Sequence, residues 1–231
     1  MKEVLRQEKK FLITTEQYYR YSRQFDRILI PDKHNLQDGY CIRSLYFDSL
    51  DDRDYQEKED GIELRRKIRL RNYGVDSSFA MLEMKQKQGA NQKKRSLRME
   101  KEDAIALIRG NTSILLKYDS PFARECYTVM NMHVYRAKTM VEYQRKAYVA
   151  KENNTRVTFD HHIIASESNF DMFQDTMHRN MVLDPYLVVL EVKFNGFLLS
   201  YIKDLVNQID ASETSVSKYC LARSISKHVR F

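Results

Sequence analysis

Charged and apolar side chains alternate in the stretch ELRRKIRLRNYG, residues 63–74. Every second position carries a cation and apolar residues lie between them: Arg65, Lys67, Arg69 and Arg71 against Ile68 and Leu70. Because successive side chains of a β-strand point to opposite faces, the pattern predicts a strand over 62–73 with one cationic face. Cations two residues apart repel each other by roughly 2 kcal/mol at an effective dielectric of about 20, so an anionic ligand would stabilise this face. For one strand alone, a solvated face screened by salt is the alternative.

The same division into a charged and an apolar face recurs in other segments. Their charged faces carry Arg6, Glu8 and Lys10; Glu83, Lys85 and Lys87; Lys94, Ser96 and Arg98; Arg156, Thr158 and Asp160; and Glu191 and Lys193. In a β-sandwich these faces would point to solvent. If the sheet instead closes into a barrel with the charged faces inward, the lumen becomes a cation-lined tunnel. Carboxylates beside cations on one face suit a metal-bridged phosphate, because the carboxylates hold the divalent cation and the cations hold the remaining oxygens.

The periodicity predicts about eight strands, a number typical of a sheet-based domain. We expect them at about 4–13, 40–48, 62–73, 79–87, 93–100, 136–149, 155–161 and 186–194. Helices are predicted after Thr14 or Thr15 and at 102–110, 120–134, 198–209 and 215–225, and the segment 49–61 is predicted as a polar connection. This order indicates an α+β fold with mainly antiparallel pairing, in a single domain over residues 1–231.

Composition and motifs limit the classes of ligand that this chain can bind and of protein to which it can belong. The 231 residues carry a net charge of +7, which favours polyanionic partners. The isolated glycines form neither a P-loop nor a GxGxxG motif, so side chains would have to hold phosphates. No nucleic-acid-binding motif is present, so nucleic acid is not an expected partner. The apolar runs are too short to cross a bilayer, and the scattered Cys41, Cys126 and Cys220 fit a reducing cytoplasm.

Short motifs follow one another in order along the chain: R-x-E-x-K at 6–10, SLYFD at 44–48, KIRLRNYG at 67–74, LEMK at 82–85, YQRKAY at 143–148, RVTFD at 156–160, LEVKF at 190–194 and SKY at 217–219. Together they resemble the VTC polyphosphate polymerase domain family, within the CYTH-like triphosphate tunnel metalloenzymes. R-x-E-x-K is similar to the first-strand signature of that family. The resemblance spans nearly the whole chain. It implies an eight-stranded antiparallel β-barrel with helices packed outside and a cation-lined tunnel that binds triphosphate or polyphosphate with Mn or Mg.

The resemblance also implies roles for single residues. Phosphate binding, and with it catalysis, is expected of Arg69, Arg71, Lys85, Arg145, Arg156 and Lys218, with Lys10, Lys94 and Lys193 as further substrate-binding residues. Glu191 is the expected principal metal ligand and a catalytic residue, and Glu8 contributes to the metal site or orients a basic neighbour. Arg69, Arg71, Lys85, Arg156 and Glu191 should then point into one lumen. His161 and His162 are expected to be structural or surface residues, because adjacent strand residues point to opposite faces and cannot easily share one metal ion.

The activity implied by the resemblance is phosphoryl transfer from ATP to the end of a polyphosphate chain. An inorganic or nucleoside triphosphatase is the alternative within the enzymes. A non-catalytic polyphosphate-binding module is the alternative of another class, since cations alone bind phosphate without turnover.

Overall fold

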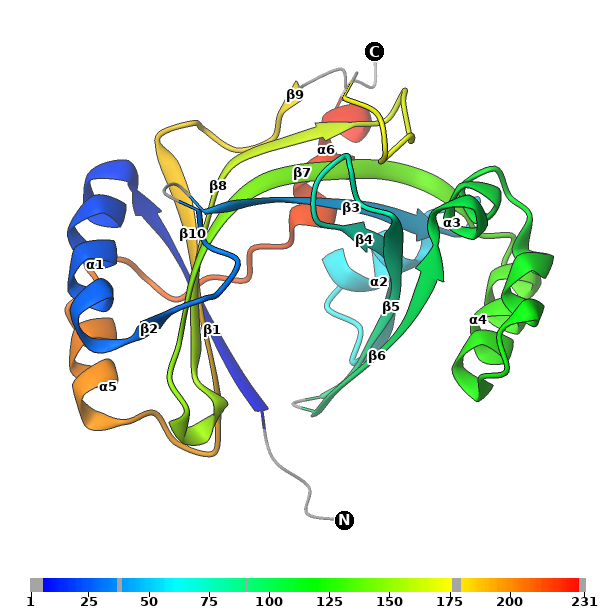
Figure 1. Cartoon of the computed structure of the whole chain (residues 1–231). Helices are drawn as coiled ribbons and strands as arrows, with labels where there is room; N and C mark the ends of the chain where they lie inside the picture. Colours follow the sequence, from blue (N-terminus) through cyan, green and yellow to red (C-terminus); the bar gives the residue numbers. More distant parts are fainter. Residues whose placement is uncertain (1–5, 37–38, 90, 176–179, 229–231) are drawn as a thin grey trace. The chain divides into compact units, whose positions relative to one another are not determined.

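The computed structural model describes residues 6–36, 39–89, 91–175 and 180–228 (Figure 1). The chain forms two compact units. Unit 1 comprises residues 1–41, 143–163 and 183–217, and unit 2 comprises 42–142, 164–182 and 218–231. The single domain expected over 1–231 stays a prediction.

The long strands form an antiparallel sheet, as predicted. They are β1 Arg6–Thr14, β3 Tyr40–Asp48, β4 Leu64–Asn72, β5 Phe79–Gln88, β6 Asn91–Glu100, β7 Arg136–Val149, β8 Arg156–Ser166 and β10 Leu187–Asn195. Two-residue strands, β2 Ile30–Pro31 and β9 Asn180–Met181, pair with β7 and β8. The hydrogen-bonded order is β1-β10-β8-β7-β3-β4-β5-β6, and within the described residues its end strands β1 and β6 do not pair. The α+β class with an antiparallel sheet is therefore confirmed, whereas the described sheet is open and the closed barrel stays a prediction.

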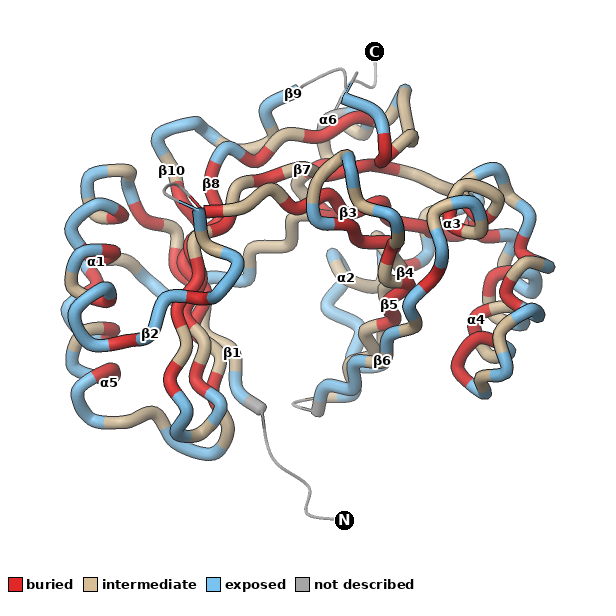
Figure 2. Tube along the Cα trace, in the orientation of Figure 1, coloured by how far each residue is buried: buried red, intermediate tan, exposed pale blue. Residues whose placement is uncertain are grey.

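Helices α1 Thr15–Ile28 and α5 Ser200–Asn207 cover the apolar face of the unit 1 strands (Figure 1). Helix α1 begins where predicted, because Thr14 caps it: the Gln17 backbone N–H donates to Thr14 Oγ1, and the Thr14 N–H donates to Gln17 Oε1. Phe25 of α1, Ile202 of α5 and Phe159 of β8 are fully buried in the shared core. Figure 2 shows the buried side of both helices turned to the strands. The apolar side chains of the strands thus lie in this core, and their charged side chains lie on the other face.

Unit 2 repeats this arrangement with its own core. Ile68, Leu70, Leu82 and Met99 are fully buried and pack with residues of α3 Lys101–Ile108, η1 Thr112–Lys117 and α4 Pro121–Met132. The cationic row that alternates with Ile68 and Leu70 therefore lies on the face of β4 away from this core.

The segment predicted as a polar connection at 49–61 contains a helix, α2 Arg53–Glu59. The prediction was wrong because a buried side chain before the helix supplies its cap. The carboxylate of Asp48 accepts hydrogen bonds from the backbone N–H groups of Asp54, at 2.9 Å, and Tyr55, at 3.0 Å, and Ser49 Oγ accepts from that of Arg53. These contacts satisfy backbone N–H groups in the first turn of α2. The polar composition of the segment does not reveal them.

Candidate functional site

The charged face of unit 2 places three lysines in register on neighbouring strands. Lys67 of β4 lies opposite Lys85 of β5, which lies opposite Lys94 of β6. Like charges directly opposite one another destabilise a sheet. On the described part of this face, at alternate positions of 65–71, 81–87 and 92–98, Glu83 is the carboxylate that faces the cations. The array therefore has a strong excess of positive charge, which suits a polyanion.

Glu83 organises the arginines of this face. Its carboxylate lies 2.7 Å from Arg69 Nη2 and 3.9 Å from Arg71 Nη1, and it also pairs with Lys94. Burial alone would raise the pKa of Glu83, but these three cations overcome that effect and lower the pKa to about 2. Glu83 thus stays ionised and holds the guanidinium groups in fixed positions.

Tyrosines extend this site toward helix α6, Lys218–His228. Arg69 Nη1 donates to the Tyr46 hydroxyl at 3.0 Å, and the Tyr46 ring stacks on that of Tyr219 with centroids 5.0 Å apart. Burial would raise the pKa of Tyr46, yet Arg69, Arg71 and Lys67 lower it overall. The Lys67 ammonium lies 5.5 Å from the Tyr219 ring centroid and 4.0 Å from Cys220 Sγ. The first turn of α6, which begins with Lys218, therefore borders the cationic face.

The charged face of unit 1 pairs acids with bases. Across β1 and β10, Lys10 lies opposite Glu191 and Glu8 lies opposite Lys193. Lys10 Nζ is 2.9 Å from Glu8 Oε1, and Lys193 Nζ is 2.8 Å from Glu191 Oε1 and 3.9 Å from Glu8 Oε2. Both carboxylates thus share neighbouring cations, unlike the cation-rich array of unit 2.

Glu191 is the most enclosed carboxylate of this pair. Burial would raise its pKa, but Lys193, Lys10, a hydrogen bond with Glu8 and Arg145 together lower the pKa well below its usual range. For Lys10, burial lowers the pKa, whereas Glu191 and Glu8 outweigh it and raise the pKa overall. Both groups are therefore charged at neutral pH.

Two arginines of unit 1 are held by carboxylates. Arg145 makes a bidentate pair with the fully buried Asp160, with Nε to Oδ1 at 2.6 Å and Nη2 to Oδ2 at 2.7 Å, and its Nη2 lies 3.9 Å from Glu191. Arg156 Nη2 donates to the Tyr40 hydroxyl at 3.0 Å and lies 2.8 Å from Asp32. These pairs fix the direction of each guanidinium before any ligand binds.

The predicted site residues thus divide between the two units. Unit 1 holds Glu8, Lys10, Arg145, Arg156, Glu191 and Lys193, and unit 2 holds Arg69, Arg71, Lys85, Lys94 and Lys218. Their convergence on one lumen stays a prediction. The partners Glu83, Asp160, Asp32, Tyr40 and Tyr46 were not predicted as site residues. Glu83 and Asp160 share the two-residue alternation with predicted residues and could have been found by it, whereas Asp32 lies outside any alternating strand.

Glu191 and Glu8 of unit 1 are neighbouring carboxylates of the type that holds a divalent cation. Across the described residues, no three His, Cys, Asp or Glu side chains are grouped so as to hold a metal by themselves. Mg²⁺ commonly binds through one or two carboxylates together with substrate phosphates, and Glu191 and Glu8 supply such a pair.

His161 and His162 lie closer together than expected. Their Nδ1 atoms are 2.7 Å apart, because His162 has a positive φ of 49° that turns its ring toward its neighbour. The expectation that the two rings point to opposite faces was wrong.

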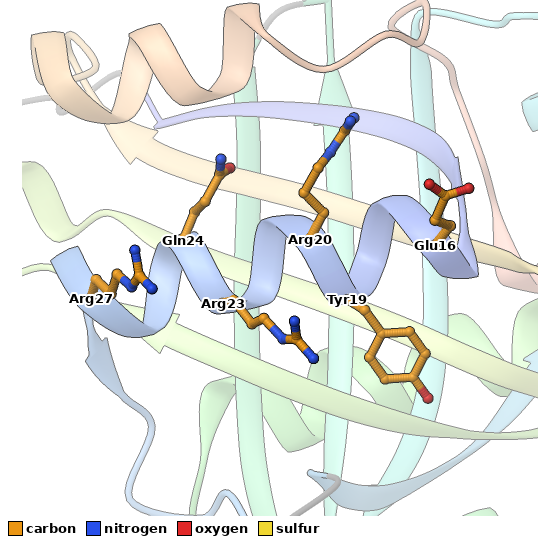
Figure 3. Close-up of a pocket in the computed structure, with 6 residues that line it drawn as sticks. All are labelled: Glu16, Tyr19, Arg20, Arg23, Gln24 and Arg27. Carbon is orange, nitrogen blue, oxygen red and sulfur yellow. The ribbon is translucent and has the colours of Figure 1, made fainter.

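A surface hollow on α1 lies outside these clusters. It is lined by residues of that helix alone: Glu16, Tyr19, Arg20, Arg23, Gln24 and Arg27 (Figure 3). None of these side chains is among the predicted site residues, and the hollow carries no part of the site. Among the helices that the structure describes, none combines the length and apolar character needed to cross a bilayer.

A comparison of the sequence with protein-family profiles identifies the family of this chain. The family profile of the VTC domain matches residues 5–227. This chain belongs to the VTC domain family. The family assignment made from the sequence is therefore confirmed. A comparison with curated proteins finds no match.

Solved structures show the same fold at low sequence identity. A provisionally named adenylate cyclase from Bacillus halodurans is similar with a TM-score of 0.55 and 12% identity, over 92% of this VTC chain and 95% of that protein. A provisionally named adenylyl cyclase from Hippeastrum, described as having a dominant triphosphatase activity, is similar with a TM-score of 0.58 and 11% identity, over 96% of both chains. These likenesses establish the fold alone.

Proposed function

We propose that this VTC domain catalyses metal-dependent phosphoryl transfer and synthesises polyphosphate from ATP. The observation that carries the proposal is the in-register row of Lys67, Lys85 and Lys94 beside Arg69 and Arg71. Opposed lysines cost stability in the free protein, so a face that retains them is best explained by a ligand with several negative charges. A triphosphate or a polyphosphate chain carries several negative charges along its length and can contact more than one of these cations.

The two charged faces have different parts in the proposed reaction. The cation-rich face of unit 2 binds phosphate oxygens, with Arg69 and Arg71 pre-oriented by Glu83. The mixed face of unit 1 supplies Lys10, Arg145, Arg156 and Lys193 as further phosphate ligands. There Glu191, assisted by Glu8, would hold Mn or Mg. When bound, that metal neutralises charge on the transferring phosphoryl group.

The chain needs no covalent intermediate for this reaction. The end of a polyphosphate chain is already anionic at neutral pH, so it can attack the γ-phosphoryl group without a strong general base. The task of the side chains is to align donor and acceptor and to offset their mutual repulsion. Arginines held by buried carboxylates, as Arg145 is by Asp160, suit that task because little reorganisation is needed.

A triphosphatase is the second candidate. It is favoured by the similarity in fold to the Hippeastrum protein, which is described as having a dominant triphosphatase activity. Hydrolysis differs from polymer synthesis in its acceptor, since a positioned water replaces the phosphate chain.

Incubation with ATP and Mn or Mg separates these functions. Polyphosphate with ADP is the expected product, and orthophosphate without polymer would identify a triphosphatase. If neither forms while tripolyphosphate binds in calorimetry, the chain is a binding module and the proposed catalysis is wrong.

A further inference from the structure

Ion pairs around Asp52 join helix α6 to the start of α2. Asp52 Oδ2 lies 2.7 Å from Arg223 Nη2 and 3.0 Å from Lys227 Nζ, and Oδ1 lies 3.0 Å from Lys138 Nζ. Arg223 Nη1 also lies 2.7 Å from Glu167 Oε1. The side chains of Asp52 and Arg223 are only 13% and 11% exposed, so water screens this contact less than a surface pair.

The conformation of Asp52 directs its side chain to the ion pairs with α6 and away from the capping of α2. Asp52 is the N-cap residue of α2, a position where aspartate normally accepts a hydrogen bond from its own helix. Here it makes no such side-chain bond, and Asp48 and Ser49 accept from the first turn instead. Asp52 also has a left-handed φ of 58°, which is uncommon outside glycine. Asp52 thus makes no side-chain cap of α2 and instead contacts three cations, two of them, Arg223 and Lys227, on α6 and the third, Lys138, on β7. Its conformation is therefore better explained by contacts with α6 than by capping of α2.

The first turn of α6 is in contact with the proposed phosphate site. The Tyr219 hydroxyl donates to Asp48 Oδ2, and its ring stacks on Tyr46, which accepts a hydrogen bond from Arg69. Cys220 follows, with its Sγ 4.0 Å from Lys67 Nζ. Lys218, a predicted phosphate ligand, is the first residue of the same turn. Any displacement of α6 therefore moves this turn relative to the cationic face.

We propose that Asp52 is a positioning residue that holds α6 against α2, so that Lys218 and Tyr219 complete the phosphate site of unit 2. This inference rests on the proposed function of that site. Asp52 does not touch the phosphate. It acts through Arg223 and Lys227, about one and two turns beyond Tyr219 along α6.

The docking of α6 is measured first without substrate. Asp52→Asn removes the charge, keeps the size and suits the left-handed conformation. We expect a thiol reagent to label Cys220 about tenfold faster or more in this variant, because charge-assisted contacts of α6 are lost. Cys126, fully buried in the unit 2 core, is an internal reference that should not change. Asp76→Asn, at an exposed position of unit 2, is the matched control and should label as the unmodified protein does.

The effect on the site is measured by tripolyphosphate affinity. We expect Asp52→Asn to weaken binding as much as Lys218→Ala does, with no further loss in the double variant, because both changes remove the same contact. A purely structural role of Asp52 would give additive losses. Unchanged Cys220 labelling, or additivity in the double variant, would overturn the proposal.

Two controls keep the outcomes separate. If Asp52→Asn also exposes Cys126, unit 2 is unfolding, and Lys227→Gln decides the question because it leaves Asp52 with Lys138 and Arg223. If the unmodified protein binds no tripolyphosphate, the proposed function fails. In that case faster Cys220 labelling shows that Asp52 holds α6, but its role in phosphate binding is refuted.

Discussion

Glu83 and Glu191 are buried carboxylates that neighbouring cations keep ionised. The two residues have different surroundings. Glu83 faces three cations, Arg69, Arg71 and Lys94, so its surroundings have a net positive charge. Glu191 is close to a second carboxylate, Glu8. The first is suited to orient arginines and the second to bind a divalent cation, and each role makes a separate prediction.

Glu191→Gln should separate binding from chemistry. The substitution keeps the size of the side chain and removes the charge proposed to hold the metal, so turnover of ATP with Mn or Mg should collapse. Tripolyphosphate should still bind to the cationic face of unit 2. Product analysis and calorimetry on the same preparation measure both effects. Normal metal-dependent turnover by this variant would exclude Glu191 as the metal ligand.

Glu83→Gln should change the dependence of stability on pH. Because the folded state lowers the pKa of Glu83 from 4.5 to about 2, its ionised form stabilises the fold above about pH 4.5, and this stabilisation is lost as the pH falls toward 2. At pH 7 the unmodified protein should be more stable than the variant by up to about 3 kcal/mol, and the difference should shrink in acid. Urea unfolding at several pH values measures this. An equal difference at pH 7 and pH 3 would contradict it.

At the scale of elements, α2 depends on two buried carboxylates, Asp48 and Asp54. Asp48 accepts hydrogen bonds from two backbone N–H groups of α2 and from the Tyr219 hydroxyl. Burial and the charge of Asp48 raise the pKa of Asp54 to about 8, and Asp54 accepts a hydrogen bond from Tyr135. The short helix is thus stabilised by side chains that precede and follow it in sequence.

Asp54→Asn should flatten the stability profile between about pH 4 and pH 8. Folded Asp54 keeps a proton that the unfolded chain loses near pH 3.8, so its contribution to stability falls as the pH rises through this window. The loss is about 1.4 kcal/mol per pH unit there, and asparagine abolishes it. The stability of the variant minus that of the unmodified protein should therefore be larger at pH 9 than at pH 6. Thermal unfolding at both pH values tests this, and parallel profiles would refute it.

At the scale of the whole molecule, the candidate residues belong to two units with different charge balance. Unit 2 has the cation excess and unit 1 has paired acids and bases. If both serve one reaction, substitutions in either unit should impair turnover. They should differ in their effect on phosphate affinity, because among the described residues the strand face of unit 2 has the larger excess of cations over carboxylates.

Tripolyphosphate should raise the melting temperature of the unmodified protein, because a ligand bound by the folded state alone stabilises it. Arg71→Ala should weaken tripolyphosphate binding by about tenfold to a hundredfold, the loss of one charge-assisted phosphate contact. Arg23→Ala, at an exposed position of α1 outside the site, is the matched control and should leave the affinity unchanged (Figure 3). Equal affinities of all three proteins would mean that the row in ELRRKIRLRNYG is only a solvated face.

The sequence by itself determined the strands, their charged faces and the family. Alternation with a period of two is a local property, so β4, β5 and β10 and their charged sides could be predicted without any partner strand. The order of the motifs along the chain was sufficient to identify the VTC domain, and the family profile confirms it.

Only the tertiary structure decided which charges meet. Lys10 meets Glu191 because β1 pairs with β10, a strand far away in sequence. Lys67 meets Lys85 and Lys94 through the register in which the consecutive strands β4, β5 and β6 pair. Helix α2 was missed because its cap comes from a buried carboxylate. Asp52 was missed because two of its cationic partners, Arg223 and Lys227, lie on α6, about 170 residues away. Burial and long-range pairing change the energy of a charged group, and neither is a property of the residues that adjoin it in the chain.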